Sequence, residues 1–198
     1  MTGLESVVLR HRLGAAGFDV HQFHYQSISE SPPTVVERLR VQVRELALLQ
    51  TVNLLGHSLG GLLVLSLLRA HPELPVARSV LLGSPVNGSR SARAFRDLPG
   101  ASWFMGGVAE DELLRPASRQ WSGPGEIGIV AGTSSVGLGR MIGNLPEPND
   151  GTVSVAETRL DGATDHCELP VSHMGMLLSS DVCACTVAFM RTGHFSRG

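Results

Sequence analysis

The feature that most constrains the fold is a short apolar segment that runs through a glycine-rich turn directly into an apolar helix. Val52–Leu55 has strand character and is followed by Gly56-His57-Ser58-Leu59-Gly60. The apolar segment Leu62–Ala70 comes next and is stopped by Pro72. A serine at such a strand-to-helix turn projects its hydroxyl from the carboxyl end of a sheet. The turn therefore predicts a layered fold and marks Ser58 as a candidate nucleophile.

The pattern G-x-S-x-G alone is weak in a chain with 23 glycines, and it also occurs as a βα turn without chemistry. The flanking strand and helix make it specific. The helix start would direct free amides and the positive end of its dipole at a developing oxyanion, with the amide of Leu59 as first donor. Gly56 and Gly60 are expected to leave room for close packing of neighbouring chain.

Helix-like and strand-like segments alternate along the rest of the chain. Thr34 and Glu37 have capping-box spacing at the start of one helix. This alternation predicts an α/β fold with a mostly parallel sheet and helices on both faces, in one domain spanning residues 1–198. Further helices are expected at Leu4–Ala16, Thr34–Leu46 and Asp181–Arg191, and strands at Phe18–Tyr25, Ser79–Leu82, Ile127–Ala131 and Cys167–Leu169.

Residues 89–125 break this alternation, because they contain no clear strand and hold both tryptophans. One interpretation is a helical pair that packs on the core. The other is a small helical cap or lid that shapes an apolar substrate pocket from Trp103, Phe104, Met105 and Trp121. The sequence leaves both interpretations open.

Composition excludes several classes of function. All 16 basic residues are arginine, which rules out a P-loop lysine, a Schiff-base lysine and a Ser–Lys dyad. A net charge of -2 argues against a nucleic-acid partner. Neither a signal peptide nor an apolar run of the ~20 residues that a transmembrane segment needs is visible. We therefore expect a cytoplasmic protein that uses no cofactor and no metal.

The three cysteines give an odd number without a disulfide framework or metal-ligand spacing, which fits a reducing compartment. We interpret Cys167, Cys183 and Cys185 as small buried residues.

A serine nucleophile needs a histidine base, and eight histidines compete for that role. His173 is the best candidate, because it lies in a loop after the last expected strand and before a helix. His166 is the next candidate. The others are interpreted as surface, helix-end or structural residues: His11, His21, His24, His57, His71 and His194.

The base in turn needs an orienting acid, for which Asp150 stands out in the turn-rich stretch Glu147-Pro148-Asn149-Asp150-Gly151. Its other interpretation is a turn aspartate that binds its own backbone. Glu157, Asp161 and Asp165 remain alternatives. The chain order Ser58, Asp150, His173 is the nucleophile–acid–histidine order of one class of serine hydrolases.

The stretch VNLLGHSLGGLLVLSLLRA resembles the nucleophile region of the α/β-hydrolase superfamily, particularly bacterial lipases and esterases. LLGSPVNGS, NDGTVSVAET and LPVSHMGML resemble later strand ends, the acid loop and the histidine loop of small members. The resemblance implies Ser58 as nucleophile, Asp150 as acid, His173 as base and Leu59 as oxyanion donor. It implies a small ester or lipid substrate, with thioesters as an alternative class; it does not indicate an oligomeric state.

One departure concerns the start of the chain. Lipases of this kind place a strand ending in His-Gly upstream, and the loop after it supplies the second oxyanion amide. Here MTGLESVVLRHRL resembles the segment that follows that dipeptide. We therefore expect an N-terminally shortened fold, from either a protein that begins earlier or a chain with half its oxyanion hole. The competing hypothesis is a catalytically silent binding protein or a truncated product.

Overall fold

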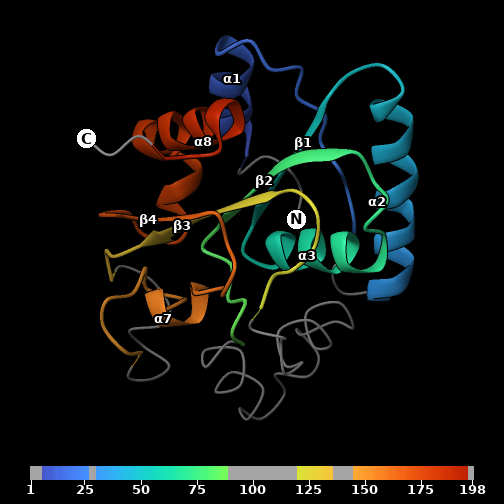
Figure 1. Ribbon diagram of the computed structural model, residues 1–198. Helices are drawn as coiled ribbons and strands as arrows, with labels where there is room; N and C mark the ends of the chain where they lie inside the picture. The colour runs from blue at the N-terminus through green and yellow to red at the C-terminus, as the bar shows by residue number, and fades with distance from the viewer. Residues whose placement is uncertain (1–5, 27–29, 89–119, 136–144, 196–198) are drawn as a thin grey trace.

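The computed structural model describes residues 6–26, 30–88, 120–135 and 145–195. Its centre is a sheet of four parallel strands in the order β1-β2-β3-β4, which is also their order along the chain (Figure 1). The carboxyl ends of all four strands therefore meet at one edge of the sheet, where α/β proteins build their sites. The strands are β1 (Val52–His57), β2 (Val76–Leu82), β3 (Glu126–Gly132) and β4 (Asp165–Leu169).

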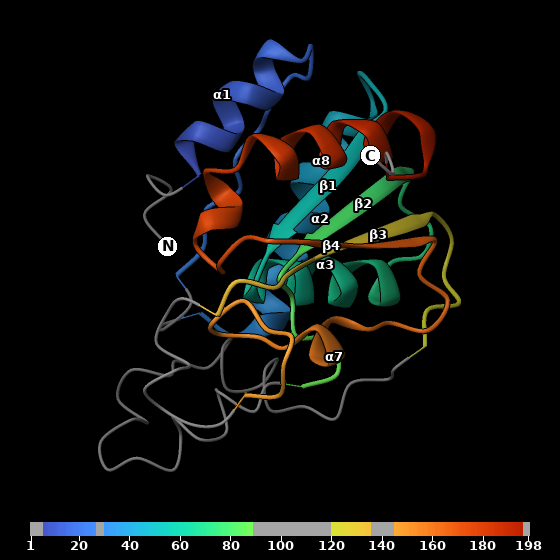
Figure 2. The same cartoon turned by 90° about the vertical axis from the view of Figure 1, so that its left-hand side faces the viewer.

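Helices cover both faces of this sheet, as Figure 2 shows. On one face lie α1 (Val7–Ala15) and α8 (Ser180–Thr192), and on the other α2 (Pro32–Ala47) and α3 (Leu59–Ala70). Two short helices sit in the later loops, α7 (Val155–Thr158) and the 3-10 turn η2 (Gly175–Leu177). This arrangement confirms the predicted α/β class with a parallel sheet between helical layers.

The core consists of two hydrophobic clusters that the sheet separates. Side chains alternate along a strand, so Leu81 of β2 packs with α2 and α3, whereas Val80 and Leu82 pack with α1 and α8. Each of these three side chains is fully buried. The near-continuous apolar sequence of β2 follows from this burial on both faces.

Two local predictions were wrong. Thr34 does not cap α2, because the helix begins at Pro32 with Ser31 as its N-cap residue, and proline suits the first helical turn. The expected strand Phe18–Tyr25 is irregular chain without strand pairing. A strand needs a neighbour to pair with. Residues 19–25 form no backbone–backbone hydrogen bond with any of the described residues.

Candidate active site

Ser58 lies at the sharp turn between β1 and α3, with φ 55° and ψ -121°. Within the described part of the chain it is the only residue other than glycine with a positive φ. Such a conformation costs about 1–3 kcal/mol and persists only where the surroundings enforce it. Here the Ser58 amide donates to the Leu82 carbonyl at 2.8 Å, which ties the turn to the end of β2.

Close backbone contact on the inner side of the turn enforces this shape. A Cβ on Gly56 would lie 2.5 Å from the Cα of Gly61, and one on Gly61 would lie 2.0 Å from Oγ of Ser84. Gly60, for which close packing was expected, has no atom within 4 Å of such a Cβ. The prediction was thus correct for Gly56 and wrong for Gly60, whose role Gly61 takes, because the helix turns residue 61 rather than 60 toward β1.

Leu59 is the first residue of α3. Its amide has no acceptor within the helix, since the first four amides of any helix lack one. The partial positive charge of the helix start adds to the ability of this amide to bind an anion beside Ser58.

The structure brings Asp150 and His173 together, although they lie 23 residues apart. His173 Nδ1 donates to Asp150 Oδ2 at 2.7 Å, and the His173 amide donates to the Asp150 carbonyl at 2.9 Å. The other carboxylate oxygen, Oδ1, accepts from the amides of Thr152 and Val153. Asp150 is 1 % exposed and His173 8 %, so the pair lies in a largely water-free environment.

Glycines at two strand ends make room for this pair. A Cβ on Gly83, directly after β2, would lie 3.1 Å from both Asp150 Oδ2 and His173 Nδ1. One on Gly132, the last residue of β3, would lie 2.8 Å from the Cβ of Asp150. Because the Leu82 carbonyl also accepts a hydrogen bond from the Ser58 amide, the end of β2 lies between the serine turn and the Asp150–His173 pair. In the sequence, each of these two glycines directly follows an apolar segment.

His57 is a second histidine in contact with His173. Its ring lies 4.6 Å from that of His173, centroid to centroid, and its Nε2 donates to the His173 carbonyl at 3.0 Å. Burial, followed by the charge of the nearby His173, lowers the pKa of His57 to about 4. His57 is therefore neutral at physiological pH and holds the loop that carries His173.

The alternative candidates are engaged elsewhere. His166 Nε2 contacts the hydroxyl of Thr158, and Glu157 forms a capping box with Ser154 at the start of α7. Asp165 accepts from the amide of Phe195. These contacts give each residue a structural role away from the Asp150–His173 pair. None of the hydrogen bonds among the described residues joins Ser58 Oγ to His173 Nε2; such bonds are often long until substrate binds.

The candidate pocket residues divide into two groups. Trp103, Phe104 and Met105 lie outside the described residues, as does most of the expected lid at 89–125. Trp121 is 6 % exposed and packs in the cluster that contains α2 and α3, with its indole N–H donating to the Gly125 carbonyl at 3.3 Å. Its described contacts are those of a core residue.

The three cysteines are free thiols. Burial, together with the neighbouring Cys185, raises the pKa of Cys167 to about 12, and burial also raises that of Cys183. Thiols with raised pKa values are poor nucleophiles and metal ligands. Within the described ranges, no cluster of three or more histidine, cysteine and acidic side chains is arranged to bind a metal ion. Helices long and apolar enough to cross a bilayer are likewise absent from the part of the chain that the structure describes.

A parallel sheet between helical layers, a serine at a strained strand-to-helix turn and a buried Asp–His pair at the same sheet edge define a hydrolase-type α/β protein. The sequence agrees, because residues 16–123, more than half of the chain, match the model of the alpha/beta hydrolase fold family. The chain belongs to that family. A search of curated proteins found no matching sequence.

Solved structures of hydrolases share this fold at low sequence identity. The mature lipase BlEst2 of Bacillus licheniformis is 19% identical with a TM-score of 0.57, and the match covers 84% of this chain and 76% of the lipase. The metagenomic carboxyl esterase MGS0156 is 16% identical with a TM-score of 0.60, over 83% of this chain and 57% of the esterase. Phospholipase PlaB of Legionella pneumophila is 16% identical with a TM-score of 0.57, over 78% and 42%. The chain thus spans about half the length of the last two proteins.

Proposed function

We propose that this protein is a serine hydrolase that cleaves carboxylic esters through an acyl-enzyme. The observation that carries the proposal is the buried Asp150–His173 hydrogen bond, 2.7 Å long, at the sheet edge where Ser58 adopts its strained turn. A carboxylate that accepts from Nδ1 fixes the imidazole as the tautomer whose Nε2 is free to accept a proton. The site thus combines a nucleophile with an oriented base.

The proposed reaction has two halves. Ser58 Oγ attacks the ester carbonyl while His173 Nε2 takes the hydroxyl proton, and the Leu59 amide donates to the oxyanion of the tetrahedral intermediate. The intermediate collapses to the acyl-enzyme as His173 gives the proton to the departing alcohol. Water, deprotonated by His173, then attacks the acyl group, and the acid leaves as Ser58 regains its proton.

The family supports hydrolysis in general, and the choice of an ester rests on this site together with the names of its structural neighbours. A lipase, a carboxyl esterase and a phospholipase share the fold. A small ester or a lipid is the proposed substrate, and thioesters, which the same acyl-enzyme chemistry cleaves, are the alternative class.

A fluorophosphonate probe tests the proposed nucleophile. The wild-type protein should be labelled on Ser58, and Ser58→Ala should not be labelled while its circular dichroism spectrum stays unchanged. Absence of labelling in folded wild-type protein would show a catalytically silent hydrolase fold. A panel of p-nitrophenyl esters and matched thioesters of increasing acyl length then separates the two substrate classes by their kcat/KM values.

A further inference from the structure

The residue directly before the proposed nucleophile contacts the proposed base. His57 is the last residue of β1, and Ser58 follows it at the strained turn. Nε2 of His57 donates to the His173 carbonyl at 3.0 Å, and the two rings lie 4.6 Å apart, centroid to centroid, with 43° between their planes. The two histidines are 116 positions apart in the chain. Their hydrogen bond therefore connects the strand that carries the serine to the loop that carries the base.

The other hydrogen bonds of His173 lead to Asp150. The His173 amide donates to the Asp150 carbonyl, and Nδ1 donates to Oδ2 of the same residue. These two bonds fix His173 relative to the acid loop, but not relative to Ser58. Among the described residues, His57 is the one other residue that forms a hydrogen bond with His173. It is therefore the residue that ties the base to the serine turn.

Packing supports the His173 loop on its inner side. Met176, within η2, is 0 % exposed, whereas Met174, directly after His173, is 49 % exposed. The backbone at His173 thus lies where the chain reaches the surface, and the hydrogen bond from His57 restrains it there. Restraint at this point matters for the proposed reaction, because a catalytic group misplaced by about 1 Å can cost on the order of 10²-fold in rate.

The charge state of His57 also suits this position. A carbonyl oxygen only accepts, so Nε2 carries the proton of the His57 ring. Burial, followed by the charge of His173, lowers the pKa of His57 to about 4, and the ring is therefore neutral at physiological pH. In the proposed reaction His173 becomes positively charged when it takes the proton of Ser58. A neutral ring beside it does not oppose that charge, whereas a cation would.

We propose that His57 is a positioning residue, which holds His173 in place relative to Ser58 by donating from Nε2 to the His173 carbonyl. This inference rests on the proposed function, in which His173 is the base. His57 takes no part in the proton transfers and acts through His173. Position 57 accordingly requires a neutral N–H donor that reaches the carbonyl, and it does not require a side chain that titrates.

Four substitutions separate the donor from the bulk of the ring. His57→Gln places a neutral N–H donor near the position of Nε2, whereas His57→Met has a similar length and no donor. His57→Asn keeps a donor on a side chain that is too short to reach. His166→Met is the matched control, because His166 is a partly buried histidine that contacts Thr158 and not His173. Circular dichroism checks that each variant folds, and if His57→Met or His57→Asn unfolds, the other makes the same comparison.

Hydrolysis of a p-nitrophenyl ester gives the first readout. In His57→Met and His57→Asn we expect kcat to fall about 10- to 100-fold, with KM changed by less than about twofold, because the base is misplaced while substrate binding is kept. His57→Gln and His166→Met should retain kcat within about threefold of the wild-type value. Equal losses of kcat in His57→Gln and His57→Met would show that ring packing matters and the donor does not, which would overturn the proposal.

Proton NMR of the His173 Nδ1–H gives a second readout that needs no hydrolysis. This proton, assigned by its loss in His173→Gln, should exchange with solvent about tenfold faster in His57→Met and His57→Asn than in the wild type and His57→Gln. Equal exchange in all four proteins would overturn the proposal, whether or not the wild type cleaves esters. The expected exchange pattern in a protein that neither cleaves esters nor reacts with fluorophosphonate would refute the proposed hydrolysis and support the positioning of His173 by His57.

Discussion

At the scale of single residues, Asp150 forms hydrogen bonds both to its own turn and to His173. Oδ1 accepts hydrogen bonds from the amides of Thr152 and Val153, as expected for a turn aspartate. Oδ2 accepts a hydrogen bond from Nδ1 of His173. The turn therefore orients the carboxylate that contacts His173. The sequence could single out Asp150 and His173 because each follows an apolar strand in a loop. It could not reveal the contact of His57 with His173, which depends on how closely two loops approach.

Replacing Asp150 with asparagine tests its role as orienting acid. Asp150→Asn keeps the size of the side chain but removes the charge that selects the Nδ1–H tautomer of His173. We expect kcat for p-nitrophenyl ester hydrolysis to fall about 10³- to 10⁴-fold with the fold retained. Asp165→Asn is the matched control and should leave kcat little changed. A larger loss in the control would transfer the role to Asp165.

The neutral, buried state of His57 predicts a pH dependence of stability. Its pKa is lowered from 6.5 to about 4, so between these values the unfolded chain binds a proton that the folded chain does not. The contribution to stability is complete above pH 6.5 and is lost as the pH falls toward 4. At 1.36 kcal/mol per pKa unit, the loss approaches about 3 kcal/mol.

Urea unfolding at several pH values measures this effect. His57→Gln keeps an N–H donor for the His173 carbonyl but does not titrate. From pH 7 to pH 4.5 the free energy of unfolding should decrease more for the wild-type protein than for His57→Gln. Parallel pH profiles of the two proteins would show that His57 is not the group responsible.

At the scale of elements, the sequence predicted the four strands β1 to β4 and the helices α1, α2, α3 and α8. The apolar patterns of β1 to β3 and of the helices reflect burial, whereas β4, with the sequence DHCEL, has no buried residue. The predicted starts and ends of the helices differ from the observed ones by a few residues. The capping-box pattern was assigned to Thr34 and Glu37, whereas the structure has one at Ser154 and Glu157, before the four-residue helix α7. A helix that short has too few residues for a periodic pattern, so its cap is the only local signal.

The serine turn predicts opposite effects for two glycines within the motif. In Gly56→Ala the new Cβ meets backbone atoms of Gly61 at 2.5 Å, so either the turn or α3 must shift. Overpacking of this kind costs about 1–3 kcal/mol. Gly60→Ala meets nothing within 4 Å and lies inside α3, where alanine is favoured over glycine by roughly 0.5–1 kcal/mol. Urea unfolding should therefore show Gly56→Ala destabilised and Gly60→Ala unchanged or stabilised; the reverse order would contradict the described turn.

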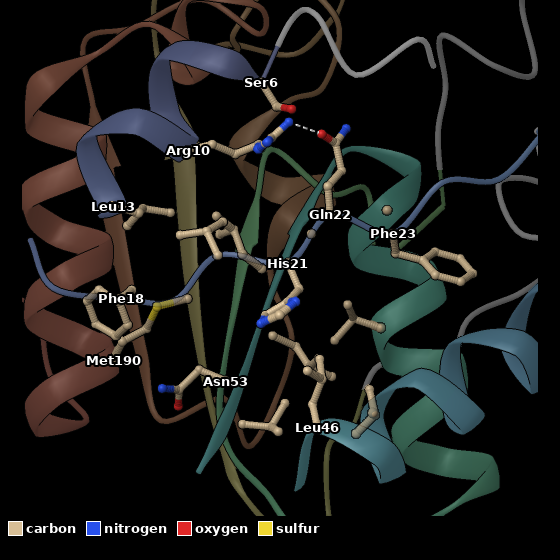
Figure 3. A pocket seen from close by; sticks show the side chains of 18 of the residues that line it. Ser6, Arg10, Leu13, Phe18, His21, Gln22, Phe23, Leu46, Asn53 and Met190 are labelled. Carbon is tan, nitrogen blue, oxygen red and sulfur yellow. Dashed lines mark hydrogen bonds between the residues drawn. The ribbon is translucent and has the colours of Figure 1, made fainter. Parts of the chain in front are cut away.

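At the scale of the whole molecule, the predicted layers were confirmed, but the expected strand Phe18–Tyr25 was not. The alternating pattern of this segment predicts a strand, but strand pairing also depends on a neighbouring segment, which the local sequence does not reveal. A cavity of about 520 Å³ lies beside β1 (Figure 3), and residues of β1 and of the segment Phe18–Phe23 line it without backbone hydrogen bonds to each other. Its position could not be read from periodicity, which reports burial and not the order of strands.

The two core clusters share one sheet, which predicts that the domain unfolds as a unit. Phe189 lies in the cluster with α1 and α8, and Leu67 lies in the cluster with α2 and α3; both are 0 % exposed. Phe189→Ala should cost about 3–5 kcal/mol and Leu67→Ala about 2–5 kcal/mol. Because β2 contributes buried side chains to both clusters, a loss on either face weakens the same strands. Each substitution should therefore lower the midpoint of a single urea transition followed by far-ultraviolet circular dichroism. Two separate transitions, with only one shifted by each substitution, would show that the faces unfold independently.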